Sequence, residues 1–461
     1  MYERLLNKWI IQNYCNLTFF FLIIDSFRND EFEKFCKKFP NSHLNKLVKN
    51  GVYFSQTISS ADATLLSLSS MLTGKFSFKT GIKSEKLNKL KPNVRTLFQI
   101  LKDQNYHLYG YNPTVVNLAN LLPKFENSDS SKESSPRITD IGNKIIKKLN
   151  ELEEPWAMFV HITDLHEPII IPKQFDNPEY GSSQYEKQIF AIDHEIGELI
   201  DNMDLQKTQL IVTADHGTYL KNIIIDEKNI NFEDNIKSEV FKKEIGKKIP
   251  KFLKPLKDKV FFSQIEHNRK MKLEKIKNMN LNHYEERNLT SEKFSTEHSL
   301  FDELLLVPLI FAGSECKSKR VYQQVRTVDI LPTLLEILKI KFNENELDGH
   351  SLYGLMNGEK NNENIAYVES NPLIQLESDD VIGIRTSKYK YFRDSINPEK
   401  RIHLYDLQND PFENENISNR NMELVKKFEK ELQDMINYEN SESDDNQDEE
   451  IYEELKKMGY A

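Results

Sequence analysis

Gln209-Leu-Ile-Val-Thr-Ala-Asp-His-Gly217 is the stretch of sequence around which the chain is organised. Leu210 to Val212 form a short apolar run, and a run that ends in polar residues and glycine is typical of a strand buried on both faces. Asp215 and His216 follow it directly. In an open α/β sheet, ligands bind beyond the carboxyl ends of the strands. A carboxylate beside an imidazole suits Zn²⁺ or Mn²⁺, although a helix-capping Asp beside a surface His remains the alternative for this stretch alone.

Two other apolar strands are expected to deliver polar side chains to an edge of the sheet. Leu17 to Ile24 is a buried run that ends in Asp25. Trp156 to Val160 is another, and it opens into a segment that carries His161, Asp164 and His166. The recurrence of this form favours a metal site over a chance pairing of Asp215 with His216.

Thr64 is predicted to lie at or near the N-terminus of a helix. Leu65, Leu68 and Leu72 follow at helical spacing, and Gly74 is a natural end for the helix. The unpaired N–H groups and the dipole of a helix N-terminus favour an anion. A hydroxyl there can be deprotonated by a metal and attack an ester of phosphate or sulfate. The alternative is that Thr64 only caps the helix.

Composition excludes several classes of protein. The chain has 461 residues, 38% of them hydrophobic and 29% charged, which indicates a soluble globular protein of one large domain with a smaller one. Its net charge of −10 argues against nucleic-acid binding. The three cysteines are far apart and indicate no disulfide framework. The apolar run from Phe19 to Ile24 is too short for a membrane span and lacks the features of a signal peptide, so we expect a cytoplasmic protein, with peripheral membrane association left open.

Eight stretches, in order along the chain, resemble motifs of a known family. They are Ile24–Asp30, Thr64–Gly74, His161–His166, Thr213–Gly217, Glu297–Pro308, Val328–Leu335, Asp348–Leu352 and Leu404–Pro411. The end, Glu454–Tyr460, also resembles a common C-terminus of that family. Together they identify the chain as similar to the sulfatase branch of the alkaline phosphatase superfamily, over nearly its whole length.

The resemblance implies a fold and a site. The fold would be an α/β sandwich with a central, mainly parallel sheet flanked by helices, plus a small C-terminal antiparallel subdomain. One divalent metal ion (Zn, Mn or Ca) would be held by three side chains and by the Thr64 oxygen; the three are Asp25, Asp215 and His216. His166 and His298 would bind the transferred group, protonate the leaving group, or help to hold a second metal together with Asp164.

The departures from the family pattern bear on the reaction. Sulfatases have Cys or Ser at the position of Thr64, which the cell converts to formylglycine; Thr cannot be converted, so none is expected. The resemblance implies that Thr64 acts directly as the nucleophile, on a phosphodiester or phosphomonoester in preference to a sulfate ester. Leu66 and Leu68 stand where the family has Pro and Arg or His, and Ser26 replaces a second metal-binding Asp. A catalytically degenerate protein that binds an anionic glycan or a partner is the alternative, and phosphomutase chemistry ranks below both.

Three parts are predicted along the chain. Residues 1–375 form the catalytic domain with a basic helical insertion at about 221–295, residues 376–437 a small α+β subdomain, and residues 438–461 an acidic linker and a terminal helix. Lys242 to Lys277 holds twelve Lys, one Arg and four acidic residues, a net charge of +9. It is either a solvated surface helix, or a basic lid that attracts an anionic substrate (possible forms are glycan-linked or lipid-linked esters) or lies on an acidic membrane.

Overall fold

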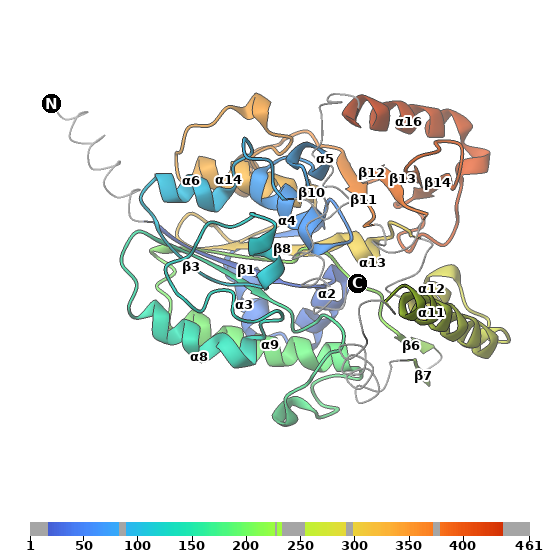
Figure 1. Ribbon diagram of the computed structural model, residues 1–461, viewed down its shortest axis with the longest axis horizontal. Helices are drawn as coiled ribbons and strands as arrows, with labels where there is room; N and C mark the ends of the chain where they lie inside the picture. Colours follow the sequence, from blue (N-terminus) through green and yellow to red (C-terminus); the bar gives the residue numbers. More distant parts are fainter. Residues whose placement is uncertain are drawn as a thin grey trace.

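The computed structural model describes residues 17–82, 89–225, 228–232, 254–291, 298–371 and 379–436. An eight-stranded sheet forms the centre of the molecule, with helices above and below it (Figure 1). Its strands are β1 (Thr18–Ile24), β2 (Val52–Ile58), β3 (His107–Tyr111), β4 (Trp156–Ile162), β5 (Thr208–Thr213), β8 (Leu306–Ala312), β9 (Lys319–Val321) and β10 (Val325–Arg326).

The sheet is mainly parallel. Its order is β10-β2-β8-β5-β1-β4-β3, and β9 also pairs with β2. Among the described strands of this sheet, only β8 runs antiparallel to its neighbours, which are β2 and β5. The carboxyl ends of β1, β4 and β5 therefore meet at one edge, as the sequence predicts.

Helices cover both faces of this sheet (Figure 1). On one face lie α4 (Thr64–Thr73), α5 (Ser77–Thr80), α6 (Leu97–Asp103), α7 (Thr114–Leu118), α14 (Ile330–Ile337) and α15 (Tyr353–Met356). On the other lie α2 (Asn29–Lys38), α3 (His43–Asn50), α8 (Ile138–Leu149) and α9 (Gln184–Asp201).

The alternation of side chains along β1 explains the two layers. Phe19, Phe21 and Ile23 join the apolar cluster that contains α4, whereas Phe20 and Leu22 join the cluster that contains α9. Successive side chains of a strand point to opposite faces, so a strand buried on both faces reads as one continuous apolar run. This is the pattern that identified β1 in the sequence.

A second, antiparallel sheet of four strands lies beside the main one, as predicted (Figure 1). It contains β11 (Ala366–Glu369), β12 (Val381–Arg385), β13 (Tyr389–Asp394) and β14 (His403–Asp406), and α16 (Met422–Ile436) packs on it. A bridge between Ala61 and Glu369 joins it to the segment that leads into α4. The fold class is thus confirmed, while the residue limits of the parts stay a prediction.

In the inserted segment after β5, the described residues form two paired strands and two helices. These are β6 (Asn222–Ile225), β7 (Lys228–Asn231), α11 (Lys254–Ile276) and α12 (His283–Thr290). The first part of the basic stretch, the expected linker at 438–450 and the expected terminal helix lie outside the described residues. No helix among the described residues is both long and apolar enough to cross a membrane.

Candidate active site

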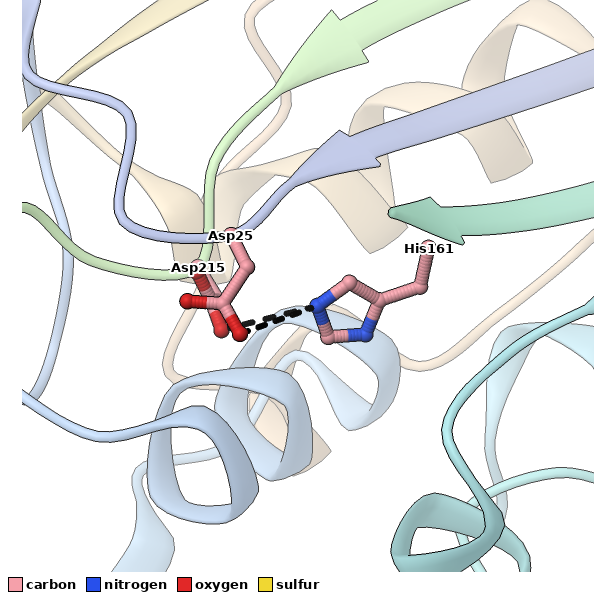
Figure 2. Close-up of side chains that lie close together, drawn as sticks. All are labelled: Asp25, His161 and Asp215. Atoms are coloured by element: carbon pink, nitrogen blue, oxygen red, sulfur yellow. Dashed lines mark ion pairs between the residues drawn. The ribbon is translucent and has the colours of Figure 1, made fainter. Parts of the chain in front are cut away.

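Three buried side chains converge where β1, β4 and β5 end. Asp25, His161 and Asp215 each offer a ligand atom, and these atoms lie within 4.8 Å of one another. His161 Nε2 is 3.8 Å from Asp25 Oδ2 and 3.7 Å from Asp215 Oδ2 (Figure 2). All three residues are fully buried. The arrangement is a buried cluster of two carboxyl groups and one imidazole.

The strand register explains why these residues meet. Ile23 of β1 pairs with His161 of β4 on one side and with Thr213 of β5 on the other. Asp25 and Asp215 each stand two positions further along, and residues two apart on a strand point to the same face. Ile23 faces α4, so the side chains of the cluster also point to that face of the sheet, toward the N-terminus of the helix.

His216 lies beside the cluster. Its Nδ1 donates a hydrogen bond to the carbonyl of Gly217 at 2.7 Å, which leaves Nε2 without a proton in the neutral ring. That Nε2 is 3.8 Å from Asp25 Oδ1 and 3.7 Å from Asp215 Oδ2. A nitrogen lone pair thus faces the two carboxylates, as a metal ligand would.

Thr64 is the first residue of α4, and it is buried. Its Oγ1 lies 3.5 Å from His216 Nε2. Ala63 occupies the cap position of the helix and has no side chain that could bind the first N–H groups, so Thr64 is not the cap. The hydroxyl thus lies beside the imidazole of His216 at the start of the helix.

The cluster fits a divalent metal ion. Three buried atoms of the cluster make no hydrogen bond within the described part of the chain. They are the two ring nitrogens of His161 and Asp215 Oδ2. Unpaired buried polar atoms are costly and call for an explanation such as an ion. Burial lowers the pKa of His161 to about 4 against the opposing charge of Asp25, so the imidazole is neutral and able to act as a ligand. Two carboxylates and imidazole nitrogens form a donor set suited to Zn²⁺ or Mn²⁺.

Hydroxyl groups around the cluster hold its carboxylates in place. Ser26 Oγ donates to Asp25 Oδ1 at 2.7 Å, and the backbone N–H groups of Ser26 and His216 donate to Asp215 Oδ1 at 3.3 and 2.8 Å. Ser59 Oγ donates to the Asp215 carbonyl. Such outer contacts orient the oxygens that would face a metal. The residue that replaces the family's second Asp, Ser26, has become one of these supports.

Arg28 pairs with a carboxylate and does not line the cavity beside the cluster. Its guanidinium makes two parallel hydrogen bonds to Asp30, at 2.9 and 2.8 Å. It also donates to the carbonyl of Thr218, to Asn288 Oδ1 and to the hydroxyl of Tyr284. Arg28 thus joins the loop after β1 to the loop after β5 and to α12.

A cavity of about 440 Å³ adjoins the cluster. Ser26 and His216 line it, and so does Asp62, which stands two residues before Thr64. Burial raises the pKa of Asp62 to about 7, with the charge of Asp380 adding to the effect. The cavity therefore reaches the edge of the cluster at Ser26 and His216.

His298 also lines this cavity. Its Nε2 is 3.7 Å from Asp380 Oδ1. Burial, and then the charge of Arg401, lower the pKa of His298 to about 4, so its imidazole is neutral near pH 7. His166 is buried, and its Nδ1 donates to the carbonyl of Glu167 at 2.8 Å. The roles expected of His166 and His298 stay predictions.

Asp164 is placed differently from the other candidates. One of its oxygens accepts from the backbone N–H of Ile138, the first residue of α8, at 2.8 Å, and the other accepts from Gln188 of α9 at 3.0 Å. Burial raises its pKa to about 7. Both oxygens therefore hold helices against the end of β4. Its role with a second metal stays a prediction.

His161 is the member of the cluster that sequence reasoning did not assign to the site. The residue was recognised at a strand end, but the resemblance directed attention to His166 in the same segment. The signal that could have found it is the pairing of the strands. Ile23 of β1 faces α4, and it pairs with His161 of the neighbouring parallel strand β4. That signal requires the pairing of the strands, which the sequence does not state.

Comparison with known proteins identifies the family of this chain. Residues 18–340 match the family model for sulfatases, and residues 293–438 match the model for the C-terminal region of N-sulphoglucosamine sulphohydrolase. The chain belongs to the sulfatase family, since the first match covers more than half of it. It is an enzyme of the ester-hydrolase class. No curated protein matches its sequence.

Solved structures share the fold at low sequence identity. Ps i-CgsB in complex with k-i-k-neocarrahexaose is 14% identical with a TM-score of 0.61, covering 96% of this chain and 97% of that one. BT4656 in complex with its substrate D-glucosamine-2-N,6-O-disulfate is 13% identical with a TM-score of 0.61, covering 92% and 99%. The phosphonate monoester hydrolase of Agrobacterium radiobacter is 14% identical with a TM-score of 0.60, covering 91% and 95%. At these identities the likeness concerns the fold alone.

Proposed function

We propose that the protein is a metal-dependent hydrolase or transferase in which Thr64 attacks a phosphate ester, in preference to a sulfate ester. The observation that carries the proposal is the position of the Thr64 hydroxyl. It lies 3.5 Å from His216 Nε2, which is itself 3.7 Å from the Asp215 carboxylate of the buried cluster. The candidate nucleophile thus lies next to the candidate ligands, and one of these, His216, also lines the cavity.

Four side chains would hold the metal ion: Asp25, His161, Asp215 and His216. A divalent cation supplies charge that lowers the pKa of a neighbouring hydroxyl and stabilises negative charge on the transferred group. His161 and His216 would each offer an imidazole nitrogen to the ion, and the two buried carboxylates would offset its positive charge.

Thr64 then supplies the attacking oxygen. As its Oγ1 forms a bond to phosphorus, the bond from phosphorus to the ester oxygen breaks, and the alcohol leaves with a proton. Water, or a second alcohol in a transferase, then releases the group from Thr64. Because Thr64 opens α4, the first N–H groups of that helix stand near the developing charge, where their partial positive charge is favourable.

His298 is better suited to donate a hydrogen bond to the leaving group than to act as its general acid. A group with a pKa near 4 carries no extra proton at neutral pH, but a neutral imidazole still donates one N–H. His166 would act on the transferred group through Nε2, since its Nδ1 donates to the carbonyl of Glu167.

The test is turnover of para-nitrophenyl phosphate, bis-para-nitrophenyl phosphate and para-nitrophenyl sulfate by wild type and by two variants. Thr64→Ala should abolish turnover with metal content unchanged. Thr73→Ala is the matched control, since Thr73 is a buried threonine at the other end of α4 whose hydroxyl donates to the Ser69 carbonyl. It should keep turnover within a few-fold of wild type. Equal turnover in Thr64→Ala and wild type would contradict a covalent role for this residue.

A further inference from the structure

A pair of buried serine hydroxyls lies between the candidate metal ligands and the helix that carries Thr64. Ser59 directly follows β2, and Ser67 is in α4, three positions after Thr64 and therefore on a neighbouring part of the helix surface. Both serines are fully buried, and their Oγ atoms are 2.9 Å apart. The backbone N–H of Ser59 donates to the carbonyl of Leu305 at 2.8 Å, which fixes Ser59 itself. The pair thus connects the end of a strand with the helix of the candidate nucleophile.

Ser59 holds the peptide group that joins two candidate ligands, Asp215 and His216. Its hydroxyl donates to the carbonyl of Asp215. The N–H of His216, at the other side of the same peptide group, donates to Asp215 Oδ1 at 2.8 Å. Because a peptide group is planar, fixing its carbonyl also fixes the backbone from which both side chains extend. One hydroxyl therefore acts on two candidate ligands at once.

Ser67 keeps the hydrogen of the Ser59 hydroxyl available for Asp215. The carbonyl of Ala61 lies 3.0 Å from Ser59 Oγ and 2.9 Å from Ser67 Oγ, so it is an acceptor within reach of both hydroxyls. Each hydroxyl has a single hydrogen to donate. Both carbonyls are satisfied when Ser67 donates to Ala61 and Ser59 donates to Asp215. Without the Ser67 hydroxyl, the Ala61 carbonyl would compete with Asp215 for the hydrogen of Ser59.

We propose that Ser59 is a positioning residue for the metal site, and that Ser67 acts on the site through Ser59. The two hydroxyls orient Asp215 and His216 together, and the contact with Ser67 ties that orientation to the helix that begins at Thr64. The proposal rests on the proposed function, because it takes Asp215 and His216 to be ligands of the metal ion. Residues that hold ligands in this way contribute to metal affinity without touching the ion.

The experiment measures the affinity for Zn²⁺ and Mn²⁺ by competition with a chromophoric chelator. Ser59→Ala should weaken binding of the tighter-bound ion about tenfold, because the peptide group between the ligands loses its donor. Ser67→Ala should weaken binding by a smaller factor, since the hydrogen of Ser59 is then shared between two carbonyls. In Ser59→Ala protein, the further change Ser67→Ala should cost no more affinity, because the hydrogen that Ser67 protects is already absent.

Ser70→Ala is the matched control. Ser70 is another fully buried serine of α4, but its hydroxyl donates to the carbonyl of Leu66, one turn earlier in the same helix, at 3.3 Å. The metal affinity of this variant should equal that of wild type. Urea midpoints of the metal-free proteins should fall alike in Ser59→Ala and Ser70→Ala, so that the difference in metal affinity reports the orientation of the ligands and not a loss of fold.

Three results would each overturn the proposal. They are unchanged metal affinity in Ser59→Ala, an equal loss of affinity in Ser70→Ala, and losses in Ser59→Ala and Ser67→Ala that add up in the double variant. Metal affinity is measured without turnover, so failure of the proposed function is seen separately, as absence of ester turnover by a wild-type protein that binds the ion. A wild type with no affinity for either ion would contradict both.

Discussion

The cluster at the strand ends and the outer part of the cavity are built in different ways. Asp25, His161 and Asp215 come from three neighbouring parallel strands, and their positions follow from strand register alone. Arg269 and Arg401 come from an inserted helix and from the loop between β13 and β14, which lie outside the main sheet. From this difference we infer that the sheet determines where the chemistry takes place, while the added segments determine which molecules reach it.

The largest effect should follow from a change in the cluster. Asp215→Asn removes a charged ligand from a site with few ligands, so metal affinity should fall by about 100-fold or more, with turnover lost in parallel. The measurement is metal content of the purified variant by elemental analysis, with far-ultraviolet circular dichroism to show that the fold is kept.

Asp164→Asn sharpens that comparison. Asp164 is also a fully buried aspartate at a strand end, but its oxygens accept from Ile138 and Gln188. We expect this variant to keep its metal while it loses some stability, because an amide can replace only part of the acceptor capacity. Full metal content in Asp215→Asn would remove Asp215 from the ligand set, whereas loss of metal in Asp164→Asn would support its place at a second metal.

A smaller effect is expected at the junction between the two sheets. Glu369 of β11 is buried, and burial raises its pKa to about 8, with the charge of Asp62 adding to the rise. Tyr367 donates to one of its oxygens at 3.4 Å, and the Ser77 hydroxyl contacts the other. The folded protein thus keeps a proton on Glu369 that the unfolded chain loses near its ordinary pKa.

The sign of the pH dependence follows from this difference. Between about pH 4.5 and 8 the folded state binds more protons at Glu369 than the unfolded state, so stability should fall as pH rises through this window. Glu369→Gln should reduce the change in the free energy of unfolding between pH 5.5 and 8 by about 2 kcal/mol. Urea midpoints of metal-free protein at the two pH values provide the measurement, with exposed Glu423→Gln as control. A wild type that gains stability over the same range would refute a protonated Glu369.

Much of the main sheet could be predicted from the sequence, because a strand buried on both faces leaves a continuous apolar run. Asp25 and Asp215 could be predicted as site residues for the same reason, because each stands within two residues of the end of such a run. His161 lies inside its strand, at the next-to-last position of β4, so only the register with Ile23 shows that it faces the cluster. Local pattern does not contain that register.

The outer cavity could not be predicted in detail for a different reason. Arg269 and Arg401 are more than a hundred positions apart in sequence, and each sits on an element whose local pattern is explained by solvent exposure. Their presence at one cavity depends on how α12 docks on Arg28 and on how the second sheet pairs with the segment before α4. The basic charge of the insertion was visible in the sequence, but which of its residues line the cavity was not.

The central claim is that Thr64, at the N-terminal end of α4, forms a covalent bond to the transferred group. Acid quenching during turnover of the best para-nitrophenyl ester, followed by proteolysis and mass spectrometry of the peptide that contains Thr64, tests it most directly. We predict a phosphoryl or sulfuryl group on Thr64 in wild type and none on this peptide in Thr64→Ala. A wild-type enzyme that turns over the ester while its Thr64 peptide stays unmodified, or that carries the group on another residue, would contradict the account.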